Sequence, residues 1–346
     1  MIIKRLRVQN FRAHSDFTAE IGSGSTLILG PNGSGKTSLL EAIYVLLQGT
    51  SFRSSDKDIL KNDGEDAWFR ADLIDQKDDA RTIKYNSLLT NGKKQFEISG
   101  KKSYRLPINA RFPVVLFEPG DLSLLSGSPA RRRQFMDRFL SQSDFGYRQA
   151  FARYNKALKQ RNILLKQDNF LPDEIFPWNL MLAEYGEVIL SKRLEFVDRL
   201  NKEIGLVYGD ISGVEDQIEI IYNGDVLCKE KIMQLLSANQ AKDRILGATS
   251  FGPHRHDLRF IFNGFEANSV ASRGENRSIV LALKFLETDI LAELSGRQPI
   301  VLLDDVFSEL DASRQQLLTN HFSQYQTIIT SVNEIDVDGF KIELES

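Results

Sequence analysis

Hydrophobic and polar positions along the first fifty residues predict two strands followed by a helix. Residues 2–11, IIKRLRVQNF, alternate apolar with basic positions, which is the pattern of a half-buried strand. Residues 25–30, STLILG, form a short apolar run that is typical of a buried strand. Apolar residues then recur at helical spacing over residues 36–48, and Gly49 is well placed to end that helix.

The pattern then changes to short strands, and after them to helices. Between residues 67 and 106, three stretches alternate apolar and polar positions, and Asn91-Gly92 is a strong hairpin signal. Residues 112–117, FPVVLF, predict another buried strand. From about residue 120 to 245, strand signals are few and long amphipathic stretches predict helices.

Strand signals return toward the C-terminus. Residues 249–264 combine strand and turn signals, and a helix is predicted from about Glu275. The apolar runs in PIVLLDD and QTIIT predict strands of a parallel sheet. We therefore expect an α/β fold with a short-stranded β subdomain. Residues 1–118 would form the first half of a head, residues 119–246 a helical insertion lobe, and residues 247–346 the second half of the head.

Composition and charge limit the class of protein without changing this picture. The 346 residues are 42% hydrophobic with a net charge of -3, so any affinity for nucleic acid must come from a local surface. The single cysteine, Cys228, excludes an intrachain disulfide and suits a reducing compartment. No stretch approaches the roughly 18 apolar residues that span a bilayer. We expect a soluble, cytoplasmic protein with no membrane partner.

Residues 30–37, GPNGSGKT, match the phosphate-binding pattern G-x-x-x-x-G-K-[ST] at every fixed position. A predicted strand and helix flank the loop, so its N–H groups and the helix N-terminus would face phosphate oxygens. Lys36 would make the catalytic contact with the β- and γ-phosphates, and Thr37 would bind Mg²⁺. The alternative is a glycine-rich turn that matches by chance. The candidate ATP-binding residues are Gly30, Pro31, Asn32, Gly33, Ser34, Gly35, Lys36, Thr37 and Ser38.

Two acids follow the apolar run of PIVLLDD. Asp304 would hold Mg²⁺, usually through water, and Asp305 would orient the attacking water or accept its proton as the catalytic acid–base residue. The alternative is a strand that ends in two solvated acids.

A second anion-binding feature begins at SRGENRS, residues 272–278. Ser272 and Gly274 lie at the start of a predicted long helix, where backbone N–H groups are free to bind an anion. One γ-phosphate cannot occupy both this position and the loop at Gly30 within a single compact head. We therefore expect Ser272 and Gly274 to contact ATP held by a second copy, which predicts an ATP-dependent homodimer. The alternative is an ordinary N-capped helix.

The predicted helical lobe carries a local excess of positive charge. Ten basic residues and only two acidic ones lie between residues 130 and 166, a bias that favours contact with DNA phosphates. The alternative is a solvated face without a partner. No helix-turn-helix, zinc-finger or RNA-binding signature indicates sequence-specific recognition. The candidate DNA-binding residues are Arg131, Arg132, Arg133, Arg148, Lys156 and Lys159.

Aromatic residues are interleaved with this basic segment. Stacking on bases is one interpretation, but helical phase places the aromatics on a stripe beside the basic face. We therefore expect the stripe to belong to the core. Its members are Tyr147, Phe151, Tyr154, Leu158 and Leu165.

GPHRHDL, residues 252–258, contains two histidines on alternate positions. On a strand, His254 and His256 would face the same side. A metal site is disfavoured because the only cysteine is distant and Asp257 is the only nearby acid. A role at the nucleotide or dimer interface and a role as a structural turn both remain open.

Taken in order, these motifs resemble the RecF family of recombination-repair proteins, relatives of the SMC-type ABC ATPases, along the whole chain. The most family-specific are SGSPARRRQFMD, KQRN and GPHRHDL; the others are NFRAH, GPNGSGKTSLLEAIYVLLQGTSFR, SRGENRS and LLDDVFSELD. The resemblance implies an ABC/SMC-type P-loop ATPase head with an antiparallel β subdomain and a helical lobe. We expect ATP hydrolysis to be slow, because Asp305 is one methylene shorter than the glutamate common in fast ABC ATPases. The resemblance implies binding to single-stranded, duplex or gapped DNA. It also implies RecO and RecR as partners in loading RecA.

The resemblance also implies roles for individual residues. It implies that Arg12 contacts the phosphates and that residues 308–311 communicate across the dimer. The sequence departs from the family pattern at Glu275, His256 and Gly120. Two other classes remain as alternatives: a transporter ATPase subunit, and an SMC-like ATPase of a defence or lesion-processing system.

Overall fold

The structure, a computed structural model, describes residues 1–53, 56–60, 68–86, 93–167, 172–225 and 227–345. Met1–Asp121 and Thr288–Ser346 form one compact unit, and Leu122–Glu287 form a second. Helix α8 (Arg273–Ser295) begins in the second unit and ends in the first. The hairpin predicted at Asn91-Gly92 lies outside the described residues.

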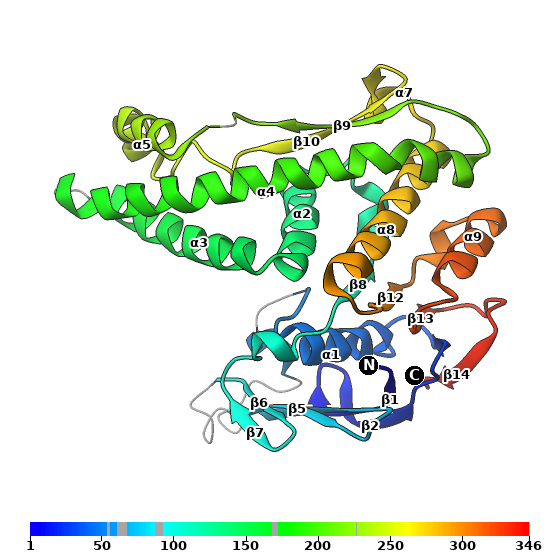
Figure 1. The fold of residues 1–346 in the computed structure, drawn as a ribbon. Coiled ribbons are helices and arrows are strands. Elements are labelled where there is room, and N and C mark those ends of the chain that lie inside the picture. The colour runs from blue at the N-terminus through cyan, green and yellow to red at the C-terminus, as the bar shows by residue number, and fades with distance from the viewer. Residues whose placement is uncertain (54–55, 61–67, 87–92, 168–171, 226, 346) are drawn as a thin grey trace. The chain divides into compact units, whose positions relative to one another are not determined.

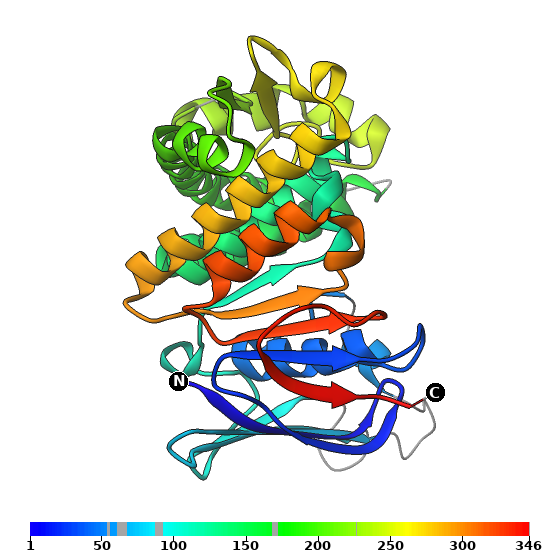
Figure 2. The ribbon, with the colours of Figure 1, turned by 90° about the vertical axis from the view of Figure 1, so that its right-hand side faces the viewer.

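A five-stranded parallel sheet in the first unit joins strands that are far apart in the sequence (Figure 2). Every residue of β8, β12 and β13 is buried, as expected for a parallel sheet covered on both faces. The apolar runs predicted as strands form four of the five members, so the predicted parallel sheet is confirmed. The strand order is β14 (Gly339–Glu343), β3 (Ser25–Leu29), β13 (Thr327–Ser331), β12 (Ile300–Asp304) and β8 (Val114–Phe117).

The first unit also contains a six-stranded sheet whose strands pair antiparallel. The short alternating stretches between residues 67 and 106 supply most of it, which confirms the predicted β subdomain. Its order is β2 (His14–Glu20), β1 (Ile3–Phe11), β4 (Trp68–Asp75), β5 (Ala80–Asn86), β6 (Gln95–Ile98) and β7 (Lys101–Ser103).

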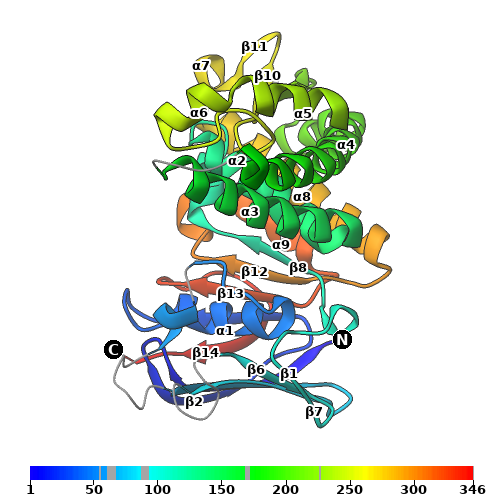
Figure 3. The same cartoon turned by 90° about the vertical axis from the view of Figure 1, so that its left-hand side faces the viewer.

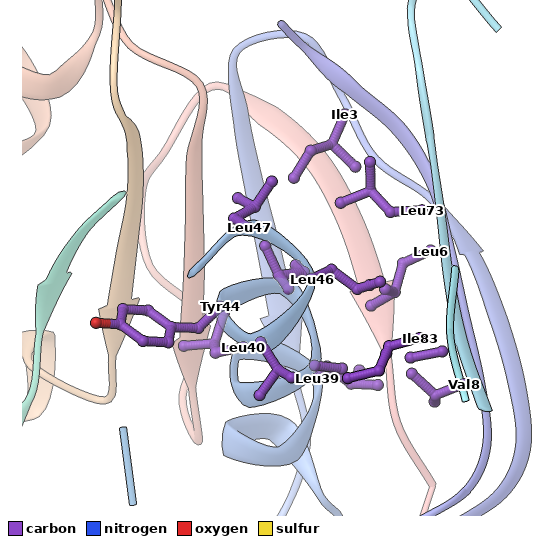
Figure 4. Close-up of a cluster of buried hydrophobic side chains, with 14 of the residues drawn as sticks. Ile3, Leu6, Val8, Leu39, Leu40, Tyr44, Leu46, Leu47, Leu73 and Ile83 are labelled. Atoms are coloured by element: carbon purple, nitrogen blue, oxygen red, sulfur yellow. The ribbon is translucent and has the colours of Figure 1, made fainter. Parts of the chain in front are cut away.

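Helix α1 (Lys36–Gln48) lies between the two sheets of the first unit (Figures 1 and 4). It begins and ends where the apolar spacing predicts, and Gly49 ends it with a φ of 85° in the left-handed region. Apolar side chains cover α1 on all sides because it packs on both sheets. Leu39 and Leu46 of α1, for example, belong to one cluster with Leu6 of β1 and Leu302 of β12.

The second unit is mainly helical and carries a three-stranded sheet (Figure 3). Its long helices α3 and α4 pack side by side, and Phe139 of α2 stacks on Phe196 of α4 at 4.3 Å between ring centroids. Its helices are α2 (Pro129–Ser143), α3 (Phe145–Leu165), α4 (Pro172–Ser212), α5 (Lys229–Ala238), α6 (Gln240–Leu246), α7 (Ala267–Val270) and the start of α8. Its strands are β9 (Ile218–Asn223), β10 (Asp257–Phe262) and β11 (Phe265–Glu266).

Two outcomes in the second unit bear on the sequence patterns. Tyr147, Tyr154 and Leu165 are buried and Phe151 and Leu158 are half-buried, so the core position predicted for the aromatic stripe is confirmed at three of its five positions. Strand β9, in contrast, lies within the stretch where strand signals are few and mainly helices are predicted. It pairs antiparallel with β10, a partner that only the tertiary fold supplies.

The remaining short elements belong to the first unit: α9 (Ala312–Phe322) and the 3₁₀ turns Asp56–Ile59, Ile108–Ala110 and Phe307–Glu309, with Pro119–Ser123 at its boundary. Across the described part of the chain, no helix is both long enough and apolar enough to cross a membrane.

Candidate functional site

The candidate site lies at the carboxyl edge of the parallel sheet, where β3, β13 and β12 end side by side. Leu29 at the end of β3 pairs with Ser331, and Asp304 at the end of β12 pairs with Thr330. The loop of residues 30–35 follows β3 directly. The sheet therefore brings this loop and the Asp304–Asp305 pair together, as parallel strands do for ligand sites.

The loop leaves backbone donors available at the start of α1. Gly35 is the N-cap residue, with a φ of 91°, and no side chain caps the helix there. A side chain at this position would clash with His14, whose Nε2 lies 2.4 Å from where a Cβ would be. Uncapped N–H groups at a helix N-terminus bind anions, and phosphate suits them.

Lys36 lies across the loop with its side chain almost fully buried. Its Nζ donates hydrogen bonds to the carbonyl oxygens of Gly30 at 2.7 Å and Pro31 at 2.9 Å. Of the neighbouring candidates, Asn32 is exposed and Ser38 donates its backbone N–H to Gly35 O at 2.9 Å. The ammonium group is thus held on the same loop as the backbone donors.

Thr37 and Asp304 meet although 267 residues separate them. The Thr37 hydroxyl donates to Asp304 Oδ1 at 2.8 Å, and Asp304 is 7% exposed. Thr330 on β13 donates to the same oxygen at 2.9 Å. A hydroxyl and a carboxylate held together in this way are oxygen ligands of the kind that Mg²⁺ takes.

Asp305 turns sharply out of the strand with a φ of 52°, in the left-handed region. Its backbone N–H donates to Thr330 O at 3.2 Å and to the Thr330 hydroxyl at 3.0 Å. Its Oδ1 is buried and has no hydrogen-bond partner among the described residues. Burial raises the pKa of Asp305, the nearby Lys36 opposes this, and the Asp304 charge raises it further. An orphaned carboxylate oxygen beside the phosphate-binding loop fits a role toward a bound water.

These residues fit a magnesium nucleotide without a dedicated metal cage. No group of three or more His, Cys, Asp or Glu side chains that could hold a metal occurs among the described residues. Mg²⁺ commonly takes one or two protein oxygens and completes its shell with water and phosphate oxygens. Thr37 and Asp304 supply that protein share.

Arg12 forms an ion pair with α1, the helix that follows the loop. Its Nη2 and Nε lie 2.8 and 2.9 Å from the two carboxylate oxygens of Glu41 on α1, which is fully buried. Its Nη1 donates to the carbonyl of Asp58. In this arrangement the guanidinium group rests on α1 and the 3₁₀ turn, and its contact with phosphates stays a prediction.

Ser272 caps the start of α8 in the second unit. Its Oγ accepts the N–H of Glu275 at 3.2 Å, and Glu275 Oε2 accepts the N–H of Ser272 at 2.6 Å. This reciprocal pair is a capping box. It gives Glu275, a departure from the family pattern, a local role in ordering the helix start. Ser272 is exposed and Gly274 half-buried.

The basic candidates divide into two groups. Arg132 is buried, pairs with both oxygens of Asp257 at 2.8 Å and donates to Gly127 O at 2.7 Å. Arg133 donates to His256 O at 2.8 Å, and Arg148 to Ser141 O. These three side chains have structural partners.

The second group faces solvent. Lys156 and Lys159 are exposed on α3, and Arg131 is half-buried. None of the three has an ion pair or a side-chain hydrogen bond within the ranges that the structure describes. Contact with DNA stays a prediction for all six, and these three side chains have the fewest competing contacts.

The histidines of GPHRHDL have separate partners. His254 Nε2 lies 3.0 Å from Thr249 O, so Nε2 carries the proton and Nδ1 accepts from the Tyr154 hydroxyl at 2.7 Å. His256 Nδ1 lies 3.0 Å from the Tyr222 hydroxyl. Burial lowers the pKa of each histidine to about 4. These contacts favour the interpretation of the motif as a structural turn.

Two residues near the loop had no assigned role in the sequence patterns. Thr330 contacts both acids of the site, and the only signal for it is its position at the end of a buried strand. His14 contacts the loop at Gly35, and its signal is its place in NFRAH.

Comparison with known proteins gives similarity over the whole chain. The family model "RecF/RecN/SMC N terminal domain" matches residues 2–340. "DNA replication and repair protein RecF" of Clostridium acetobutylicum is 33% identical over 351 residues, which cover 98% of this chain and 95% of that protein. A solved structure of RecF with ATP has a TM-score of 0.85 at 31% identity, covering 99% of this chain and 95% of that one.

A more distant likeness concerns the fold alone. An SMC head bound to the C-winged helix domain of ScpA has a TM-score of 0.53 at 14% identity, covering 96% of this chain and 90% of that one. Together with the family match, it confirms the predicted ABC/SMC-type head fold.

Proposed function

Because this chain belongs to the RecF family, we propose that it is a DNA replication and repair protein that binds ATP and closes as a homodimer on DNA. The relative and the solved structure named above are a RecF protein and a RecF–ATP structure. The observation that carries the proposal is the convergence of Lys36, Thr37 and Asp304 beside a loop with free N–H donors. Each residue in that group has a role toward a magnesium nucleotide.

The proposed hydrolysis uses side chains that are already in place. Lys36 exchanges its two loop carbonyls for phosphate oxygens, a stronger, charge-assisted contact. Thr37 and Asp304 would hold Mg²⁺, which would neutralise developing negative charge on the phosphates. Asp305 orients a water through its unpartnered Oδ1. The side chain of Asp305 is one methylene shorter than the glutamate common in fast ABC ATPases, so we expect ATP turnover to be slow.

The proposed dimer uses the exposed start of α8. Ser272 and Gly274 of one copy contact the γ-phosphate held by the loop of the other copy. Support comes from the capping box, which fixes the orientation of the Ser272 hydroxyl and leaves the residue exposed. ATP then stabilises the dimer, because each nucleotide is bound by two chains.

The proposed DNA surface is the exposed basic face of α3. Lys156 and Lys159 lie three residues apart, so they share one side of the helix. The absence of any sequence-reading motif suits contact with the phosphate backbone. By resemblance to the family, the partners are RecO and RecR, and the outcome is RecA loading at gapped or stalled replication sites.

A direct test measures binding of fluorescent duplex and gapped DNA with ATP, with ADP and without nucleotide. Ser272→Arg adds bulk and charge at the interface, whereas Ser272→Ala removes the same cap without bulk. We expect ATP to strengthen DNA binding most in the wild type, less in Ser272→Ala, which loses the hydroxyl contact, and not at all in Ser272→Arg. DNA binding that is indifferent to nucleotide and to both variants would refute the proposal.

A further inference from the structure

The start of β2 contacts the phosphate-binding loop at Gly35. His14, the first residue of β2, places Nε2 3.1 Å from the carbonyl oxygen of Gly35. The fit is close, because a Cβ on Gly35 would lie 2.4 Å from that nitrogen and 3.3 Å from Ala13 Cβ. The turn therefore packs against the residue where the loop becomes a helix.

The chemistry of this contact fixes which partner donates. A carbonyl oxygen only accepts hydrogen bonds, so His14 Nε2 must carry the proton. The same oxygen accepts the N–H groups of Ser38 at 2.9 Å and Leu39 at 3.2 Å. Gly35 O thus closes the first turn of α1 on one side and receives the imidazole on the other.

Within the described part of the chain, His14 is the hydrogen-bond partner that Gly35 has from outside α1, so the orientation of Gly35 depends on it. Gly35 has a φ of 91°, where glycine loses much conformational entropy on ordering, and no side chain caps α1 there. Rotation of this peptide would turn the N–H groups at the start of α1 away from a phosphate.

We infer that His14 is a positioning residue for the nucleotide site, which holds Gly35 so that the loop's N–H donors stay aimed at the phosphates. The inference rests on the proposed ATP-binding function and adds a residue to it. The ring is itself fixed, since it packs on Phe17 at 5.3 Å and lies where Phe11 pairs with His14 in the β1–β2 ladder.

An alternative role for His14 is to anchor the turn between β1 and β2, but other contacts already attach this turn. Arg12 binds Glu41 through two hydrogen bonds, and its backbone N–H donates to Ile59 O at 2.9 Å. Loss of the imidazole therefore leaves the turn attached to α1. The effect of a His14 substitution should appear in nucleotide affinity rather than in folding.

Three substitutions separate these roles. Glutamine places its amide nitrogen at about the position of Nε2, whereas the shorter asparagine places it near Nδ1 and cannot reach Gly35 O. His14→Ala removes the donor altogether. The affinity of each purified variant for a fluorescent ATP analogue is measured with Mg²⁺, and its unfolding midpoint is measured without nucleotide. Lys36→Ala, which removes the phosphate contact, is the reference for a lost site.

We expect His14→Ala and His14→Asn to bind ATP about fivefold to tenfold more weakly, as for loss of one hydrogen bond. His14→Gln should stay within about twofold of the wild type, and the Asn and Gln variants should unfold at the same midpoint. In steady state, KM for ATP should rise in the Ala and Asn variants while kcat changes little.

Two results would overturn the inference while leaving the proposed function intact. One is wild-type affinity in all three variants, with Lys36→Ala still defective. The other is an equal loss of ATP affinity in His14→Asn and His14→Gln. A wild-type protein that binds ATP no better than Lys36→Ala would instead refute the proposed ATP-binding function and the inference with it.

Discussion

The hydroxyl of Thr330 donates a hydrogen bond to Oδ1 of Asp304 at 2.9 Å across the neighbouring strands β13 and β12. The same hydroxyl accepts the backbone N–H of Asp305 at 3.0 Å. Thr330 is fully buried, so no water competes for these contacts. One hydroxyl thereby sets the directions of both acids of the site.

Replacement of Thr330 by valine keeps the shape and removes the hydroxyl. A hydrogen bond to a charged group contributes about 1.5–3 kcal/mol, so we expect kcat for ATP to fall about tenfold or more. Thr330→Ser retains the hydroxyl and should keep most of the rate. Nucleotide affinity, measured separately, should change little in either variant. Equal rates in the valine variant and the wild type would show that the hydroxyl does not orient the acids.

Arg161 predicts a large effect on stability. It is fully buried, and its Nη1 lies 2.7 Å from Asp243 Oδ2, which is also fully buried. Arg161→Met leaves that carboxylate without its partner, which should cost about 3–5 kcal/mol. Urea unfolding followed by Trp178 fluorescence in α4, with Trp68 of the first unit replaced by phenylalanine in every variant, reports on the second unit.

Two matched variants complete that measurement. Lys159→Met alters an exposed residue of the same helix and should shift stability by less than about 0.5 kcal/mol. Asp243→Leu added to Arg161→Met removes the stranded charge and should recover part of the loss. If Arg161→Met lowers the free energy of unfolding no more than Lys159→Met does, the buried ion pair of Arg161 and Asp243 does not stabilise the fold.

The exposed lysines of α3 predict a salt-dependent effect on DNA binding. Lys156→Ala with Lys159→Ala should make the slope of log affinity against log salt shallower by about 1.8, because each phosphate contact contributes about 0.9. The control is Lys101→Ala with Lys102→Ala, two exposed lysines of β7. Unchanged slopes in both double variants would place the DNA surface elsewhere.

The two histidines of GPHRHDL predict a loss of stability in mild acid. Burial lowers the pKa of His254 and His256 to about 4, from 6.5 when exposed. Between these values the unfolded chain binds protons that the folded chain does not. Their contribution to stability is therefore complete above pH 6.5 and is lost as the pH falls toward 4. Each histidine contributes a slope of at most about 1.4 kcal/mol per pH unit.

Urea unfolding between pH 7.5 and 4.5 checks this slope. His254→Gln with His256→Gln should flatten the dependence of the unfolding free energy on pH. A wild-type curve that runs parallel to that of the double variant would assign the acid sensitivity to other groups.

Local pattern predicted the elements that carry the site. Helix α1 follows from apolar spacing and Gly49, and the parallel strands follow from their apolar runs. Strand β14 was not predicted, because four of its five residues are exposed and it contains no apolar run. It exists because the edge of β3 offers backbone partners.

Within the basic segment, the burial of individual arginines was not predicted. Arg161 lies four residues before Leu165 and seven after Tyr154, on the buried stripe, yet its charge suggested a surface position. Arg132 likewise lies three residues before the buried Phe135. Helical phase could have flagged both, but their acidic partners Asp243 and Asp257 are far along the chain.

In the proposed dimer, each nucleotide is bound by the loop of one chain and by Ser272 of another. The Ser272→Arg variant has an intact phosphate-binding loop but cannot contact ATP held by a partner. The Lys36→Ala variant has an intact Ser272 but cannot bind ATP in its own loop. Mass measurement with ATP should give monomers for each variant alone. An equal mixture should give dimers, because one intact composite site forms in each mixed pair. Monomers in the mixture, alongside wild-type dimers, would contradict a shared site.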